Sequence, residues 1–165
     1  MDILLNAANA ALLLAHDIRR EVEVGLLLLG PPNPPRFVRL VGFGLKSFQP
    51  EIRSNAALVR RTLEDASRVE HQMSPGVYGS IATFEEALDQ LGPTFVHLKE
   101  GGKDIREAAL PTDATFVLSD NQELLAEEER ILRDRGALVV GLGPFPLHAD
   151  HAIAIVHNEL DRRAA

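Results

Sequence analysis

Apolar residues fall into short, regularly spaced runs along most of this 165-residue chain. In residues 4–19 they recur every three or four positions, which predicts an amphipathic helix ending at two arginines. Residues 22–29 are almost continuously apolar, a pattern typical of a buried strand, and residues 37–41 predict a second short strand. The proline-rich residues 30–35 must lie outside the sheet, because proline cannot donate to a strand ladder.

In the middle of the chain, residues that favour the start of a helix are more informative than the apolar pattern. Pro50 and Glu51 favour the first turn of a helix that we expect to continue to about Val69. Residues 74–79, which are rich in serine, proline and glycine, predict turns. Thr83 and Glu86 have the spacing of a capping box and predict a helix that ends at Leu91.

The second half of the chain alternates between strand and helix patterns. Strands are predicted at residues 94–98, 114–118 and 137–141, with flexible residues 99–102 after the first of them. Helices are predicted at residues 122–135, before a glycine stop, and at residues 149–160. This alternation predicts an α/β fold, with a largely parallel sheet covered by helices, in a single domain spanning residues 1–165.

Three loops follow the predicted strands of the second half. They contain Leu98, Ser119 and the segment Leu142–Leu147. In a parallel sheet the carboxyl ends of the strands meet at one edge, where open α/β sheets bind their ligands. We therefore expect these three loops to surround one ligand.

The segment Leu142–Leu147 limits what that ligand can be. Gly141 and Gly143 begin a dinucleotide-binding glycine pattern, but Pro146 occupies the place of its third glycine. Pro144 and Pro146 also lack the N–H groups that a phosphate cradle would need, which excludes a phosphate site here. A stiff loop with free backbone groups suits adenine in a ligand without phosphates.

Histidines near the C-terminus raise the alternative of a metal site. His148 and His151 are three residues apart, but His157 lies about two helical turns further along. The chain has no cysteine, and zinc requires a near-tetrahedral set of ligands. We therefore expect no metal, and we interpret these histidines as helix caps or as part of a subunit contact.

The charge is distributed unevenly along the chain. The net charge is −7, but residues 1–61 carry +3 and residues 62–165 carry −10. This asymmetry permits a basic face despite the acidic total, and the alternative is a scatter of solvated charges. The positive residues of the first part are Arg19, Arg20, Arg36, Arg39, Lys46, Arg53, Arg60 and Arg61.

The apolar N-terminal segment has the features of a core helix. Residues 3–15 include Asn6 and Asn9, lack the basic start of a signal peptide, and are too short to span a membrane. We therefore expect a cytoplasmic protein without a membrane span.

Short motifs spread over nearly the whole chain resemble those of the TrmY family, the tRNA pseudouridine N1-methyltransferases of the SPOUT superfamily. They occur here in the same order as in that family. The matching segments are residues 9–20, 32–35, 41–42 with 45–46, 50–51 with 53–54, 74–78, 97–98, 102–105, 147–151 and 157–158 with 160–161.

The resemblance implies a SPOUT-type fold with a deep trefoil knot near the C-terminus, and a homodimer. Independently, the helix after Ala149 carries apolar residues on more than one face, which also favours a dimer interface. The resemblance further implies that S-adenosylmethionine (SAM) binds at the knot. The implied cofactor pocket consists of Leu98, Ser119, Leu142, Gly143, Pro144, Phe145, Pro146, Leu147 and Ala152.

The implied reaction is transfer of a methyl group to N1 of pseudouridine 54 in the tRNA T-loop. Removal of the N1 proton needs an acceptor, and Asp17 is our candidate. Arg19 and Arg20 would hold a phosphate or stabilise negative charge on the base. The alternative for all three residues is an ion pair at the end of a helix.

This chain departs from the family pattern in three places. The family usually begins with an additional strand and loop, and we expect this chain to lack them. Ser119, Asp120 and Asn121 stand where relatives tend to have Gly-Asp-His, and Ala152 stands where they tend to have cysteine. The alternatives to a pseudouridine methyltransferase are therefore a non-catalytic dimeric SPOUT-fold protein that binds SAM or RNA, and a methyltransferase for another RNA.

Overall fold

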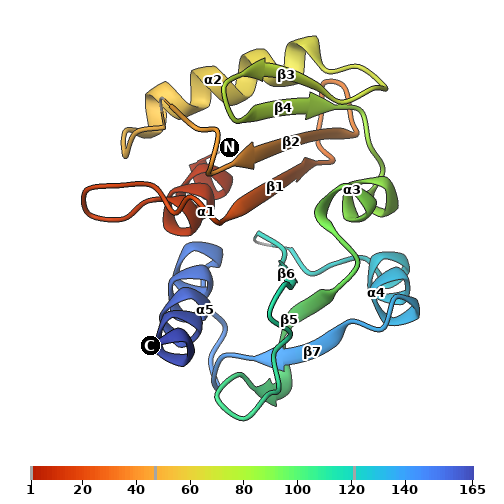
Figure 1. Ribbon diagram of the computed structural model, residues 1–165. Coiled ribbons are helices and arrows are strands. Elements are labelled where there is room, and N and C mark those ends of the chain that lie inside the picture. Colours follow the sequence, from red (N-terminus) through yellow and green to blue (C-terminus); the bar gives the residue numbers. More distant parts are fainter. Residues whose placement is uncertain (1, 47, 121) are drawn as a thin grey trace. The chain divides into compact units, whose positions relative to one another are not determined.

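The computed structural model describes residues 2–46, 48–120 and 122–165 (Figure 1). The chain forms two compact units, residues 1–87 and residues 88–165. The expectation of a single domain stays a prediction. No helix among the described residues is long and apolar enough to cross a membrane.

The first unit contains a four-stranded sheet in which every pair of neighbouring strands is antiparallel, in the order β1-β2-β4-β3. The prediction of a largely parallel sheet is therefore wrong for this half of the chain. β1 and β2 are adjacent and joined by the proline loop, a connection that antiparallel strands allow and parallel strands do not. The elements are α1 (Asp2–Leu12), β1 (Glu23–Leu28), β2 (Arg36–Val41), α2 (Ile52–Asp65), β3 (His71–Ser74) and β4 (Val77–Ser80).

The core of the first unit lies between the sheet and its two helices. Leu5, Ala8 and Leu12 of α1 pack in one cluster with Val59 of α2. Strand residues from β1, β2 and β4 complete this cluster, so α1 and α2 cover the same face of the sheet. The predicted apolar stripe of the first helix is thus the surface that α1 buries.

α1 ends at Leu12, earlier than the apolar pattern predicted. After it the chain folds back, with the Leu14 N–H donating to the Asp17 carbonyl and a β-bridge joining Leu13 to Ile18. The prediction that Arg19 and Arg20 form a helix C-terminus is therefore wrong, since both lie beyond this turn. α2 likewise ends at Asp65, before the predicted Val69.

Residues 71–80, predicted as turns over much of their length, form a hairpin. β3 and β4 pair antiparallel around Pro75 and Gly76. Gly76 has φ +75°, which a residue with a side chain rarely adopts, so glycine permits the tight reversal. The predicted turn is present, but it is short and strands flank it on both sides.

The second unit contains a parallel three-stranded sheet in the order β6-β5-β7, as predicted for this half of the chain. α3 crosses the boundary between the units and begins with the predicted capping box, in which Thr83 Oγ1 accepts from the Glu86 N–H at 3.3 Å. The remaining elements are α3 (Phe84–Leu91), β5 (Phe95–Asp104), β6 (Thr115–Val117), α4 (Ala126–Asp134), β7 (Leu138–Gly141) and α5 (Ala149–Ala164).

Successive side chains of β5 point to opposite faces of the second sheet. Val96 packs with Val140 of β7 and Val156 of α5. The neighbouring Phe95 points to the opposite face, where the Arg135 guanidinium, just after α4, lies over its ring. α5 and α4 therefore cover opposite sides of this sheet (Figure 1).

β5 is longer than the predicted strand at residues 94–98. Leu98 and Lys103 both pair with Val140, so residues 99–102 form an excursion between two pairings with the same strand. The chain then continues along β7, and the Ile105 N–H donates to the Gly141 carbonyl at 3.0 Å. Residues predicted as a flexible loop are thus part of the sheet edge.

Candidate functional site

The structure brings the three predicted loops of the second unit to one edge of the sheet. His97 is level with both Val117 of β6 and Val139 of β7, so the three parallel strands end close together. Leu98, Ser119 and Leu142 follow at this carboxyl edge. The three loops therefore lie at the same edge of the sheet, as the strand pattern predicted.

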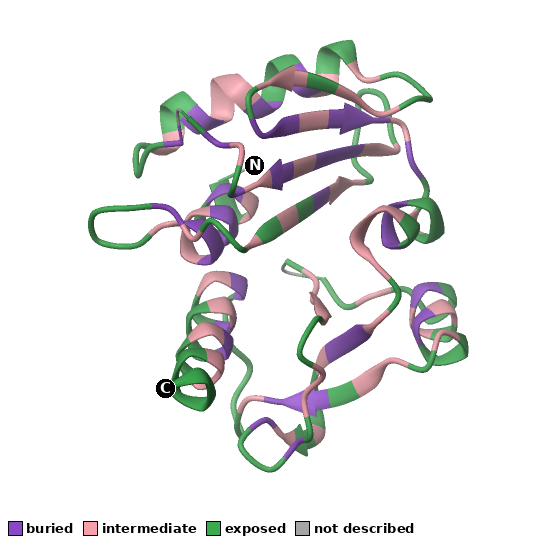
Figure 2. Cartoon of the chain, viewed as in Figure 1, coloured by how far each residue is buried: buried purple, intermediate pink, exposed green. Residues whose placement is uncertain are grey.

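The loop between β7 and α5 supplies most of this edge. Leu142 packs against the core of the second unit, whereas residues 143–148 are all exposed (Figure 2). Phe145 is 76% exposed and Leu147 is 41% exposed. Gly143 has φ +141°, a conformation that favours glycine. The loop thus presents apolar side chains and backbone carbonyls without the N–H groups of its two prolines.

Ala152, the last predicted cofactor residue, lies in the first turns of α5. Its N–H donates to the His148 carbonyl at 2.9 Å, and the residue is buried. Because the helix follows the loop directly, the small side chain of Ala152 lies close in sequence and structure to the carboxyl edge. The predicted cofactor residues therefore all belong to the second unit.

Two glycines hold the end of β7 against the excursion of β5. A Cβ atom on Gly102 would lie 2.6 Å from the Val140 carbonyl carbon and 2.8 Å from the Gly141 nitrogen. A Cβ on Gly141 would lie 2.9 Å from the Gly102 oxygen. The two backbones can approach this closely only because both residues lack side chains. Sequence reasoning missed this contact, although the Gly101-Gly102 pair was a signal for it.

His97 and Lys99 belong to β5 and are the residues before and after Leu98. Burial lowers the pKa of His97, which favours the neutral ring. Lys99 forms an ion pair with Glu129 of α4. That hydrogen bond raises the pKa of Lys99 and lowers the pKa of Glu129. Lys99 therefore already has an anionic partner within the protein.

Asp17, Arg19 and Arg20 lie in the first unit, in the turn after α1. Asp17 Oδ1 accepts from the Ile18 N–H at 2.7 Å and from Arg20 Nη2 at 3.2 Å. These bonds, the backbone one first, lower the pKa of Asp17, whose side chain remains 65% exposed. Asp17 is therefore an accessible carboxylate that is ionised at neutral pH.

Arg20 connects this turn to the one that follows β2. Its Nη1 donates to the Leu45 carbonyl at 2.8 Å and to the Gly42 carbonyl at 3.2 Å. Together with Asp17, three acceptors of the protein hold this guanidinium. Arg20 thus fixes the position of Asp17 and of residues 42–45 relative to each other.

The whole chain, residues 1–165, matches the model of a protein family described as "Putative SAM-dependent RNA methyltransferase". The chain belongs to this family.

Curated relatives agree with that membership. A protein from Methanocella arvoryzae is 43% identical over 165 residues, which are 99% of this chain and 85% of the relative. A protein from Methanococcoides burtonii is 38% identical over 167 residues, covering 98% and 83% of the two chains. Both relatives are named "tRNA (pseudouridine(54)-N(1))-methyltransferase".

A solved structure shares the fold. The crystal structure of Archaeoglobus fulgidus Nep1 bound to S-adenosylhomocysteine aligns with a TM-score of 0.68, over 99% of this chain and 71% of that chain. The sequence identity is 16%, so the likeness concerns the fold. It supports an α/β architecture shared with that structure.

The basic residues of the first unit fall into two groups in this family member. Arg39 is held by Glu70 and Glu23 and lies 4.9 Å from the centre of the Tyr78 ring. Arg36 donates to the backbone carbonyls of Pro35 and Leu63. The other group, on the turn after β2 and on α2, consists of exposed side chains: Lys46, Arg53, Arg60 and Arg61. The predicted basic face is therefore reduced to part of its residues.

Two of the C-terminal histidines lie close together at the start of α5. His148 and His151 have ring centroids 5.9 Å apart in an edge-on arrangement. No group of three or more histidine or carboxylate side chains among the described residues could hold a metal ion. His148 precedes α5 as its N-cap residue, without a side-chain capping bond.

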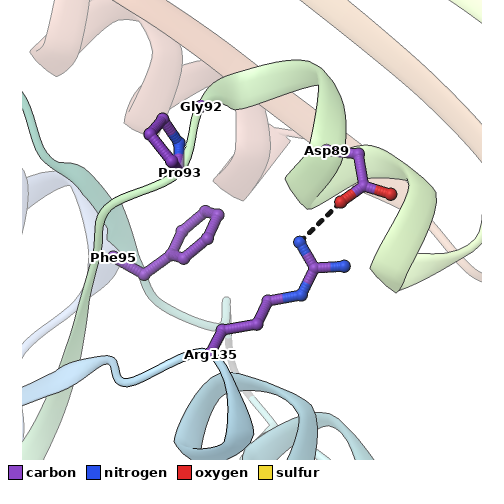
Figure 3. A pocket seen from close by; sticks show the side chains of 5 residues that line it. All are labelled: Asp89, Gly92, Pro93, Phe95 and Arg135. Carbon is purple, nitrogen blue, oxygen red and sulfur yellow. Dashed lines mark hydrogen bonds and ion pairs between the residues drawn. The ribbon is translucent and has the colours of Figure 1, made fainter.

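A shallow cavity of about 460 Å³ lies at the opposite, amino edge of the same sheet (Figure 3). Gly92, Pro93 and Phe95 line it where β5 begins, and Arg135 lines it just before β7. Arg135 spans the cavity to an ion pair with Asp89 at 2.6 Å. Because the strands begin here, this cavity is separate from the carboxyl edge, and the charges of Arg135 and Asp89 in its lining neutralise each other.

Proposed function

We propose that this chain is a SAM-dependent methyltransferase that acts on N1 of pseudouridine 54 in tRNA. The observation that carries this proposal is the 38–43% identity, over nearly the whole chain, to relatives that are named for this activity. A location in the cytoplasm, where tRNA is available, belongs to the same proposal.

The carboxyl edge of the second sheet would hold the cofactor. Leu98, Ser119, the segment Leu142–Leu147 and Ala152 would surround it. SAM has no phosphate, which suits a loop whose two prolines offer no N–H groups, and the exposed Phe145 and Leu147 would cover its apolar parts. SAM supplies the methyl group.

Asp17, Arg19 and Arg20 would act on the base. In pseudouridine the ribose is attached at C5, which leaves N1–H free to lose its proton. Asp17 is exposed and ionised, so its second oxygen can accept that proton. Arg20 would orient this carboxylate, and Arg19 would stabilise negative charge on the base or hold a phosphate.

The reaction itself provides the test of this function. We would incubate the purified protein with SAM and a tRNA that carries either pseudouridine or uridine at position 54, and analyse the nucleosides by mass spectrometry. Uridine is a matched control, because its N1 is bonded to the ribose and cannot be methylated. A methylated nucleoside only from the pseudouridine substrate is expected, and methylation of both or of neither would contradict the proposal.

We expect cofactor binding to be independent of metal. SAM should bind with the same affinity, measured by calorimetry, before and after treatment with EDTA, because the donor set of a metal centre is missing from the described residues. Addition of zinc should likewise leave the affinity unchanged. A loss of SAM binding in EDTA that zinc restores would indicate that the C-terminal histidines bind a metal ion.

The trefoil knot implied by the family resemblance is also part of the proposal. The doubled pairing of β5 with Val140 and the contact of Gly102 with Gly141 support it. These contacts hold β5 against the end of β7 just before the chain enters the loop to α5.

We further propose a homodimer that involves α5. Its buried residues, Ala149, Ala152 and Val156, form one stripe, whereas Ala154 and Ile155 are exposed apolar residues beside it. Ile155→Glu should therefore shift the protein from dimer to monomer, because a charge would be desolvated in the interface. Sedimentation velocity at micromolar concentration measures this shift.

A matched control adds the same charge at the end of the same helix. Ala164→Glu places it on an exposed residue in the last turn of α5 and should leave the dimer intact. A wild-type protein that sediments as a monomer would contradict the dimer, and a dimeric Ile155→Glu variant would exclude this face of α5.

A further inference from the structure

The turn after β2, residues 42–46, presents an aromatic side chain to solvent. Phe43 is 84% exposed, the largest exposed fraction among the large apolar side chains of the described residues. A phenylalanine in this position buries little of its own surface against the fold. Its side chain is therefore available for a partner.

The backbone beneath Phe43 is held rigidly. The Gly42 N–H donates to the Val22 carbonyl at 2.9 Å, and the Leu45 N–H donates to the Val41 carbonyl at 3.1 Å. A Cβ atom on Gly42 would lie 2.1 Å from the Arg19 oxygen, so the turn is pressed directly onto the preceding segment. Arg20 also donates to the carbonyls of Gly42 and Leu45, which holds both ends of the turn. A fixed turn loses little entropy when its side chain binds a partner.

The surroundings of the turn combine apolar walls with a cation. A cavity of about 300 Å³ adjoins it and is lined by Leu45, Leu58, Ser74, Pro75, Val77 and Lys46. Lys46 is exposed and lies three residues after Phe43 in the same turn. An apolar ring with a cation in the same turn matches a partner that has flat apolar groups and negative charges.

We propose that Phe43 stacks on an unpaired base of the RNA substrate, while Lys46 contacts a neighbouring phosphate. This inference rests on the proposed function, which makes tRNA the partner. Proteins read unpaired bases of RNA loops by stacking them on aromatic side chains, and cations beside the ring bind the backbone. A second copy of this chain is the competing partner for an exposed aromatic ring, but the exposed cation Lys46 in the same turn favours the phosphate-bearing RNA.

Binding of a fluorescently labelled tRNA T-arm hairpin, measured by anisotropy without SAM, tests the stacking. Phe43→Ala should weaken binding by about 5- to 100-fold, the range observed when an aromatic stacking partner of one base is removed. Phe43→Tyr keeps the ring and should bind within about 2-fold of wild type. Val69→Ala is the control, because Val69 is an apolar side chain of the same unit that is 76% exposed but has no ring.

The salt dependence separates the two contacts. Phe43→Ala should leave the slope of log affinity against log salt concentration unchanged, because stacking releases no counterions. Lys46→Ala should make that slope shallower by about 0.7–0.9, corresponding to one lost phosphate contact. Thermal unfolding curves equal to wild type would show that both variants are folded, as expected for exposed side chains.

The outcomes distinguish this inference from the proposed function. If wild type binds and methylates the T-arm while Phe43→Ala binds it equally well, the stacking inference is overturned and the proposed function stands. If wild type binds single-stranded oligouridine in a Phe43-dependent way but not the T-arm, stacking stands and the tRNA assignment fails. If Phe43→Ala changes only the sedimentation of the protein, the ring contacts a second copy and the inference is overturned.

Discussion

Asp17→Asn is expected to lower the rate of methyl transfer by about 10²- to 10⁴-fold, the usual contribution of a positioned general base. Asparagine has nearly the same shape as aspartate and can still accept the hydrogen bond from the Ile18 N–H. It cannot take up a proton from the base. The rate constant should be measured in single-turnover experiments with saturating SAM and pseudouridine-containing tRNA.

The control for this variant is another carboxylate of the same segment. Glu21 is exposed and four residues beyond Asp17, so Glu21→Gln removes one negative charge nearby without changing Asp17. We expect Glu21→Gln to react at the wild-type rate. An equally active Asp17→Asn would exclude Asp17 as the base, and a parallel loss of thermal stability would assign it a structural role.

The pH dependence gives an independent check on the same residue. The hydrogen bonds from Ile18 and Arg20 lower the pKa of Asp17 below its ordinary value of 3.8. Asp17 should therefore remain ionised from pH 5 to pH 8, and its protonation should cause no loss of rate in that interval. A fall in rate near pH 6 that disappears in Asp17→Asn would contradict this ionisation state.

The parallel half of the fold could be predicted from the sequence because its signals are local. The strands around Val96, Phe116 and Val140 are short, apolar and separated by helical patterns, and this alternation requires crossover connections. The rule that ligands bind at the carboxyl ends of such strands then placed Leu98, Ser119 and Leu142 together without further information.

The antiparallel half could not be predicted in the same way. β3 and β4 include polar residues such as His71, Gln72 and Ser80, so they lack a clear apolar period. The end of α1 was misplaced because apolar residues continue to Ala15, while the Asp17 carboxylate accepts from the Ile18 N–H in the turn that follows the helix. Such side-chain-to-backbone bonds compete locally with helix formation and leave no periodic signal.

The contacts made by Arg20 and Gly102 depend on segments that are distant in the sequence. Arg20 was predicted to contact RNA. Its hydrogen bonds to the carbonyls of Gly42 and Leu45 form only because the fold brings the turn after β2 beside the turn after α1. The role of Gly102 likewise emerges only when the chain returns to β7. Residue type and spacing do not encode these approaches.

Gly102→Ala is expected to weaken SAM binding by at least about 10-fold and to destabilise the protein by about 1–3 kcal/mol, as overpacking generally does. The new methyl group would lie 2.6 Å from the Val140 carbonyl carbon and 2.9 Å from the Val140 Cα. Both atoms belong to the backbone of β7, so they cannot move away as a flexible side chain would. The end of β7 would have to shift, and it leads directly into the loop proposed to hold the cofactor.

Gly101→Ala, at the preceding residue, separates this local displacement from a general loss of stability. Gly101 has φ +77°, so alanine there costs about 1–2 kcal/mol of backbone strain, but nothing lies within 4 Å of the new Cβ. The two variants should therefore have similar unfolding free energies, measured by urea denaturation, and different SAM affinities, measured by calorimetry below their unfolding temperatures. If Gly102→Ala binds SAM as tightly as Gly101→Ala, the end of β7 does not position the cofactor loop, and the carboxyl edge of this sheet is not the SAM site.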